Sequence, residues 1–288
     1  MTDTALRFAT DENLRDRLRK IRHVALDMDG TIYKGGSLFE FTNPFLSQLT
    51  QLGIGYSFLT NNSSKSTVDY VRHLGKIGIS AGVEQVYTST QASIEYLRET
   101  LPSVQRLFLL GTASMSAEVE AAGFTMTAES AADEPDAVLV GFDAALIYSR
   151  LCRAAYWIAR GKPFLATHPD RICPTDEPTV LVDCGAICAA LREATGREPD
   201  AVFGKPDPRM LRGLLSIHDL NPEKLAMIGD RLYTDLEMAR RAGAFGVLVL
   251  TGEATAENAR LATPQPDLVA ENIAEFGHFL ARSRESND

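Results

Sequence analysis

The chain has 288 residues, a formal net charge of −9 and a hydrophobic content of 45%. That length is enough for one larger and one smaller domain, and the composition is typical of a globular protein. The negative charge argues against nucleic acid or an anionic membrane surface as a partner. No apolar run approaches the roughly 20 residues that span a bilayer, so we expect no membrane partner.

The N-terminal segment and the cysteines bear on location. Residues 1–20 are polar and charged, which predicts a helix and not a secretory signal. The four cysteines form no Cys-x-x-Cys pair, and Cys184 and Cys188 stand four apart on one predicted helical face, a poor arrangement for zinc. Reduced, mostly buried thiols and a cytoplasmic location are the expectation.

Strands and helices alternate from the start of the chain. An apolar run, His23 to Leu26, predicts a buried strand that ends at Asp27. A Gly-rich flap over 30–41 precedes a helix over 43–51, with Asn43 as its cap and Pro44 at its first position. The next expected elements are a strand over 54–59, a polar loop over 60–64 and a helix over 66–76.

The middle of the chain has its own alternation. Helices are expected over 90–100, 114–122, 146–160 and 185–195, strands over 106–110, 124–127, 137–141 and 163–166, and a loop over 167–183. The first pattern then resumes with a strand end at Lys205, a strand over 225–228, a helix over 234–242, a strand over 246–250 and a helix over 273–282. This order predicts an α/β protein with a Rossmann-like open parallel sheet. Residues 1–84 and 201–288 would form the core domain, and residues 85–200 an inserted α/β cap domain.

Polar residues stand where the predicted core strands end. In an open parallel sheet these ends meet at one edge, where ligands bind. Carboxylates that meet there repel unless a cation or a proton lies between them, and Mg2+ suits one or two carboxylates plus phosphate oxygens. The strand-end residues are Asp27, Asp29, Thr60, Asn61, Lys205, Asp230 and Asp235.

Each of these residues has a plainer interpretation when taken alone. Asp29-Gly30 could be a simple turn between strands. Thr60 could cap the next helix, Lys205 could be a surface lysine, and Asp235 could be an acid in the first turn of a helix. Their common order and placement favour a metal-and-phosphate site.

In these strand-end residues and their order, the sequence resembles the haloacid dehalogenase superfamily of aspartate-nucleophile phosphatases. More narrowly it resembles the class IIA branch of p-nitrophenylphosphatases and NagD-like nucleotide phosphatases, in which a large cap is inserted between the second and third motifs. The resemblance covers nearly the whole chain after Arg22. Its motifs are Asp27-Met28-Asp29-Gly30-Thr31, Leu59-Thr60-Asn61, Gly204-Lys205-Pro206 and Gly229-Asp230-Arg231 with Asp235.

The resemblance implies a catalytic and metal role for four acids. Asp27 would be the nucleophile that forms an aspartyl-phosphate. Asp29 would be the general acid and then the general base. Asp27, the backbone carbonyl of Asp29 and Asp230 would hold Mg2+, and Asp235 would lie behind these ligands or hold a metal-bound water.

The resemblance also implies a phosphate site and a cap contact. Thr60 and the backbone N–H of Asn61 would bind phosphate oxygens, and Lys205 would neutralise their charge. His168 stands where the branch usually has Asn; it and Asp170 are candidate substrate contacts, although a structural histidine is an equal alternative. The loop over 171–183 would follow as the region that selects the substrate.

The most direct expectation is a Mg2+-dependent phosphomonoester hydrolase acting on a small-molecule phosphate ester, of the sugar phosphate or nucleoside monophosphate type. Two alternatives are a non-catalytic metabolite-binding or regulatory protein on the same fold, and a phosphotransferase to an acceptor other than water. Product analysis and a turnover assay separate them. By analogy alone, the resemblance implies a homodimer formed through the cap.

Overall fold

The computed structural model describes residues 11–174 and 179–285. The chain divides into two compact units, and each is described here by itself. The first unit contains the residues up to Leu59, Leu74–Val86 and the residues from Leu211 onward; the second contains Thr60–His73 and Tyr87–Met210. The cap limits at residues 85 and 200 stay a prediction.

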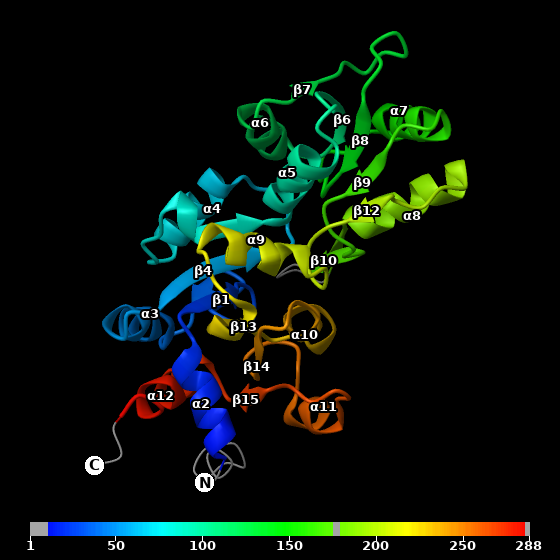
Figure 1. Cartoon of the computed structure of the whole chain (residues 1–288). Helices are drawn as coiled ribbons and strands as arrows, with labels where there is room; N and C mark the ends of the chain where they lie inside the picture. The colour runs from blue at the N-terminus through cyan, green and yellow to red at the C-terminus, as the bar shows by residue number, and fades with distance from the viewer. Residues whose placement is uncertain (1–10, 175–178, 286–288) are drawn as a thin grey trace. The chain divides into compact units, whose positions relative to one another are not determined.

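A six-stranded sheet has the order β15-β14-β13-β1-β4-β5, and its central strands pair in parallel. Figure 1 shows its blue N-terminal strands beside its yellow and orange C-terminal strands. Val24, Ala25 and Leu26 of β1 are fully buried, as a strand covered on both faces requires. The strands are β1 His23–Asp27, β4 Gly55–Thr60, β5 Val86–Thr88, β13 Leu225–Gly229, β14 Phe245–Val249 and β15 Leu268–Ala270. The α/β class with an open parallel sheet is thus confirmed.

Most helices of the first unit fall close to their predicted bounds, with some corrections, whereas α11 was not predicted. They are α2 Glu12–Lys20, α3 Thr42–Gln51, α10 Glu237–Ala242, α11 Ala256–Leu261 and α12 Ile273–Arg282. Asn43 does not cap α3, because the helix begins at Thr42 and the Asn43 amide donates to the Gly78 carbonyl (3.1 Å). The predicted helix over 234–242 begins as a π-helix, Leu232–Leu236, and only then becomes α10.

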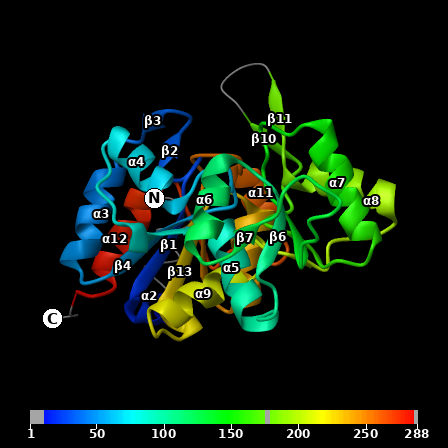
Figure 2. The same ribbon diagram turned by 90° about the horizontal axis from the view of Figure 1, so that it is seen from above.

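The second unit has a five-stranded parallel sheet of its own, in the order β12-β9-β8-β6-β7. Helices α7 and α8 lie side by side (Figures 1 and 2), and Trp157, Ile158 and Leu191 on them pack with Phe108 and Val138 of the sheet. The strands are β6 Arg106–Leu110, β7 Thr125–Met126, β8 Ala137–Val140, β9 Phe164–Ala166 and β12 Ala201–Val202; the helices are α5 Ser89–Thr100, α6 Ala113–Ala121, α7 Tyr148–Ala159 and α8 Cys184–Thr195. The helices α4 Thr67–Lys76 and α9 Arg209–Ile217 each include residues of both units.

Two short hairpins occupy segments that the sequence suggested were irregular. β2 Tyr33–Lys34 pairs with β3 Ser37–Leu38 in the flap. β10 Ile172–Pro174 pairs antiparallel with β11 Val180–Val182, so the prediction of a loop over 167–183 was wrong for these strands. Residues 175–178 of that predicted substrate-selecting loop lie outside the described residues. Among the described helices, none has the length and hydropathy that a membrane crossing needs.

Candidate active site

Asp27 and Asp29 lie at and just beyond the end of β1. Asp27 is its last residue, and the chain then turns, with the amides of Thr31 and Ile32 donating to the Met28 carbonyl (3.2 and 3.0 Å). The Thr31 hydroxyl donates to Asp27 Oδ2 (3.4 Å). Asp29 is exposed, and its Oδ1 accepts from the Gly35 amide (3.3 Å). The turn begins directly after Asp27, so Asp29 lies beyond the end of β1.

Gly30 makes the turn fit beside a second strand end. Its φ of +82° lies in the left-handed region that glycine adopts most readily. A Cβ at Gly30 would lie 2.6 Å from Asp230 Oδ2, and one at Gly252 would lie 1.9 Å from the same atom. Asp230 follows β13, is buried, and its Oδ2 accepts from the Glu253 amide (2.7 Å). Two glycines therefore pack directly against this carboxylate.

Asp235 completes a cluster of acids in the first unit. It lies in the π-helix, is 1% exposed, and its Oδ2 accepts from the Thr234 hydroxyl and the Arg231 amide (both 3.3 Å). One carboxylate oxygen from each of Asp27, Asp230 and Asp235 lies within 4.8 Å of the other two. An acid whose only role is in the first turn of a surface helix would be exposed, so the burial of Asp235 beside two other acids argues against that plainer interpretation.

Arg231 is a cation that interacts with two of these acids. Burial opposes its charge, but attraction to Asp230, and further to Asp27 and Glu253, outweighs burial and raises the pKa of Arg231. Its Nε lies 3.0 Å from Glu253 Oε2, which also accepts from the Tyr233 hydroxyl (3.0 Å). From the sequence, Arg231 was quoted only within the motif Gly229-Asp230-Arg231 and given no role in the site, and Glu253 had no signal. Three carboxylate oxygens this close together are a donor set that a hard divalent cation fits.

Three predicted phosphate-binding residues belong to the second unit. Thr60 ends β4 and is buried, and its hydroxyl accepts from the Asn62 amide (3.1 Å), so it does not cap α4, which begins at Thr67. Asn61 is buried and its side chain is hydrogen-bonded to the backbone of Lys205 at both ends of the amide group. Lys205 is only 4% exposed, which excludes the interpretation of an ordinary surface lysine.

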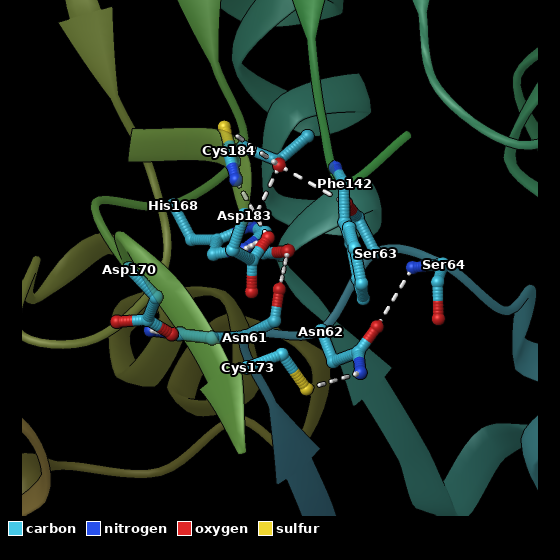
Figure 3. A network of polar contacts seen from close by, with 12 residues as sticks. Asn61, Asn62, Ser63, Ser64, Phe142, His168, Asp170, Cys173, Asp183 and Cys184 are labelled. Carbon is cyan, nitrogen blue, oxygen red and sulfur yellow. Dashed lines mark hydrogen bonds and ion pairs between the residues drawn. The ribbon is translucent and has the colours of Figure 1, made fainter. Parts of the chain in front are cut away.

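His168 lies in a buried polar network (Figure 3). It is 0% exposed, with Nδ1 2.8 Å from the Thr167 hydroxyl and Nε2 2.9 Å from Asp183 Oδ1. Burial alone would lower its pKa, but the neighbouring Cys184 and Asp183 raise the pKa of His168 to about 9. Asp183 Oδ1 also accepts from the Cys184 amide at the start of α8 (2.6 Å). With both ring nitrogens engaged, the geometry favours the structural alternative, and the substrate contact stays a prediction.

Asp170 and Cys184 also take part in this network. Asp170 is half-buried and its Oδ2 accepts from the Asn61 amide (3.1 Å). All four cysteines are free thiols, but only Cys184 and Cys188 on α8 are buried; Cys173 is half-buried and Cys152 is exposed, so the expectation of mostly buried thiols holds for two of the four. Ser63, which the sequence analysis did not single out, accepts from the Phe142 amide (2.9 Å) and bonds the Thr167 hydroxyl (3.2 Å).

The fold and the acid cluster define an α/β protein with a candidate metal site at its parallel sheet, and comparison with known proteins identifies the family. The family model of haloacid dehalogenase-like hydrolases matches residues 24–125, and a HAD-hydrolase-like model matches residues 202–276. Glycerol-3-phosphate phosphatase of Gallus gallus is 31% identical over 86% of each chain. The ribonucleotide monophosphatase NagD of Escherichia coli K12 is 29% identical over 89% of this chain and 98% of that protein.

Two solved structures are similar throughout. The 4-nitrophenylphosphatase of Thermotoga maritima is 39% identical, with a TM-score of 0.85 over 91% of this chain and 98% of that one. The glycerol phosphate phosphatase of Mycobacterium tuberculosis, in complex with magnesium, is 31% identical, with a TM-score of 0.81 over 90% of this chain and 77% of that one; a calcium complex of it is similar as well. The chain belongs to the haloacid dehalogenase-like hydrolases, in their class IIA NagD-like branch, and is a phosphoric monoester hydrolase.

Proposed function

We propose that this hydrolase cleaves small phosphate monoesters with the help of Mg2+, through an aspartyl-phosphate on Asp27. The observation that carries the proposal is the cluster of Asp27, Asp230 and Asp235, whose carboxylate oxygens lie within 4.8 Å of one another. Carboxylate oxygens at that separation can be ligands of one hard divalent cation. The magnesium and calcium complexes of the Mycobacterium tuberculosis relative support a divalent ion.

The metal would be held by the acids, which retain the roles that the family motifs imply. Asp27, the backbone carbonyl of Asp29 and Asp230 would be its ligands, with Asp235 beside them. When bound, the ion would supply positive charge to the phosphoryl oxygens and orient the ester. The small number of protein oxygens suits Mg2+, which keeps several waters, better than Ca2+.

The chemical step would use Asp27 and Asp29 in turn. The Asp27 carboxylate would attack phosphorus, so that a carboxylate–phosphorus bond forms and the ester P–O bond breaks. Asp29 would give its proton to the leaving oxygen and then take one from the water that hydrolyses the aspartyl-phosphate. Its exposure beyond the turn at Met28 is consistent with an acid that exchanges protons with solvent.

Binding of the phosphoryl group would fall to Thr60, Asn61 and Lys205. The support for these roles is their match to the family motifs, together with the burial of the Lys205 ammonium, which favours an anion as its neighbour. Phosphoryl transfer depends mainly on positioning and charge neutralisation, which these groups and the acids would supply together.

The substrate is proposed as a class. The similar proteins are named for glycerol-3-phosphate, ribonucleotide monophosphates and 4-nitrophenyl phosphate, all small phosphate esters. We extend that class to this chain, as a small phosphorylated metabolite of the sugar phosphate or nucleoside monophosphate type. A cytoplasmic location and a homodimer through the cap stay predictions of the sequence.

The test is turnover on a panel of phosphorylated metabolites and 4-nitrophenyl phosphate, with Mg2+, with Ca2+ and with excess chelator. We expect release of inorganic phosphate with Mg2+, poor activity with Ca2+ and none with chelator. Full activity in chelator would contradict the metal role. Formation of an alkyl phosphate in the presence of added alcohol would show transfer to an acceptor other than water.

A further inference from the structure

The side chain of Asn61 bridges two backbone groups of a single residue. The Lys205 amide donates to Asn61 Oδ1 (2.6 Å), and Asn61 Nδ2 donates to the Lys205 carbonyl (3.0 Å). A backbone N–H can only donate and a carbonyl can only accept, so these two partners fix which end of the Asn61 amide is oxygen. The carboxamide thus holds the main chain of Lys205 at both of its polar groups.

Asp170 holds the same carboxamide from the other side. Asn61 Nδ2 gives its second N–H to Asp170 Oδ2 (3.1 Å), which uses both donors of the amide. The Asp170 backbone is itself fixed, because its carbonyl accepts from the Gly185 amide in the first turn of α8 (2.7 Å). Figure 3 shows Asp170 and Asn61 lying next to each other in this network.

The main chain just before Lys205 packs tightly against Asn61. Gly204 has a φ of +72°, and a Cβ on it would lie 2.7 Å from Asn61 Oδ1 and 2.8 Å from the His168 Cβ. The segment therefore passes close to Asn61, and the Asn61 carbonyl is anchored in turn by the Ser89 hydroxyl (2.5 Å). A displacement of the Asn61 amide would be transmitted to the Lys205 backbone.

We propose that Asn61 and Asp170 are positioning residues for Lys205: the Asn61 carboxamide sets the Lys205 main chain, and Asp170 orients the carboxamide. This inference rests on the proposed role of Lys205 in binding the phosphoryl group. It gives Asp170 a role that does not involve contact with the leaving group. It also gives the Asn61 side chain a role beyond that of its backbone N–H.

The decisive readout is the inhibition constant of inorganic phosphate, measured against hydrolysis of 4-nitrophenyl phosphate. This constant does not depend on the leaving group or on the fraction of enzyme that is folded. Asn61→Ala removes three hydrogen bonds and is expected to raise the constant about 10-fold and to raise KM for every ester by a similar factor. Asp170→Ala, which leaves the Lys205 bonds in place, is expected to raise both about 3-fold.

A reciprocal exchange tests the pairing itself. Asn61→Asp places a carboxylate beside Asp170 and removes the donor to the Lys205 carbonyl, so it should be more harmful than Asn61→Ala. Adding Asp170→Asn supplies an N–H that can donate to the new carboxylate, and the double variant should recover about 10-fold in kcat/KM over Asn61→Asp alone. Independent effects of the two changes would overturn the proposed link.

Asn62→Ala is the matched control. Asn62 is the next residue, and its Oδ1 accepts from the Ser64 amide (2.9 Å) while its Nδ2 lies 3.9 Å from Cys173 Sγ, with no bond to Lys205. Its inhibition constant for phosphate should stay within about 2-fold of wild type.

The outcomes separate this inference from the proposed function. If Lys205→Ala raises the phosphate constant but Asn61→Ala does not, the positioning role is wrong while the proposed function stands. If Asp170→Ala changes KM for some esters only and leaves the phosphate constant unchanged, Asp170 contacts the leaving group and the link to Lys205 is wrong. A wild-type protein that hydrolyses no phosphate ester would overturn both.

Discussion

The two parallel sheets of this chain end very differently at their carboxyl edges. In the first unit β1 ends at Asp27 and β13 is followed by Asp230, and these acids lie close to each other and to Asp235. After β8 and β9 of the second unit come Asp143 and His168, and these are held by oppositely charged neighbours: Asp143 Oδ2 lies 2.7 Å from Arg150 Nη1, and His168 Nε2 lies 2.9 Å from Asp183.

The difference shows that a parallel sheet does not by itself provide a ligand-binding site. Both edges present polar groups beyond strand ends, as open α/β sheets do. In the second unit each of these charges has a counter-charge, which stabilises the fold. In the first unit three acids lie together beside Arg231, an arrangement that suits a metal ion. The predictions below test this contrast by removing charges from each edge.

The largest effect is expected from Asp27→Asn. Turnover should fall by about 10^3-fold or more, because a carboxamide cannot be the nucleophile. In chelator, the same change should leave the melting temperature equal or higher, because it removes one of three like charges. Initial rates and thermal unfolding check the two expectations. Asp16→Asn, at an exposed acid of the same unit, is the control; near-normal turnover in Asp27→Asn would refute the nucleophile.

The opposite result is expected at the second edge. Asp143→Ala leaves Arg150 without its buried partner and should lower the free energy of unfolding by about 3 kcal/mol. kcat/KM for 4-nitrophenyl phosphate should stay within about 3-fold of wild type at a temperature where the variant is folded. Glu129→Ala removes the more exposed partner of the same arginine and should cost under about 1 kcal/mol. Equal costs for the two variants would contradict the role of burial.

Magnesium should stabilise the first unit through the acid cluster. An ion that binds only the folded state adds about 2.7 kcal/mol at 100 times its Kd. Wild type should therefore melt higher in Mg2+ than in chelator, and Asp230→Asn should lose most of that shift. Asp143→Ala, although less stable, should keep it. An unchanged shift in Asp230→Asn would place the metal elsewhere.

A smaller effect concerns the amino end of the first sheet. His23 begins β1, with Nε2 2.9 Å from the Ser57 hydroxyl and its ring centroid 4.1 Å from that of His218. Burial, and then the charge of His218, lower the pKa of His23 from 6.5 to about 3. His23 therefore becomes protonated below pH 6.5 in the unfolded chain, but only below about pH 3 in the folded chain.

The sign of the pH dependence follows from that difference. The His23 contribution to stability is fully present above pH 6.5 and is lost as the pH falls toward 3, by about 2 kcal/mol between pH 6.5 and 5. His23→Gln can keep a hydrogen bond to Ser57 and should flatten this part of the curve. Unfolding by denaturant at each pH measures it, and parallel curves for the two proteins would contradict the assignment.

The sequence was a good guide to the elements and to the first edge. Buried strands such as β1 and β13 are continuous apolar runs followed by acids, a strong signal. It was a poor guide where a partner distant in the sequence decides the outcome. Asn is a residue type that often caps helices, yet the Asn43 amide donates to the Gly78 carbonyl. The β10 and β11 strands are too short and too exposed to show an alternation of buried and exposed residues.

Hydrogen bonds between residues that are distant in the sequence could likewise not be predicted. Nothing in the residues near Asn61 indicates that its amide would meet Lys205, 144 positions away. The bond of His168 to Asp183 could not be predicted, because a substrate-binding and a structural histidine just after a strand give the same local pattern. Arg231 could have been found from its place beside Asp230 in the family motif.

Gly252 has a consequence for mutational surveys of this enzyme. It carries no chemistry, yet a methyl group on it would lie 1.9 Å from Asp230 Oδ2, an oxygen that the Glu253 amide already holds. Any side chain there must push the Asp230 carboxylate out of place. In a library scored for loss of activity, Gly252 should therefore group with the acids, although it has no side chain that could take part in the reaction.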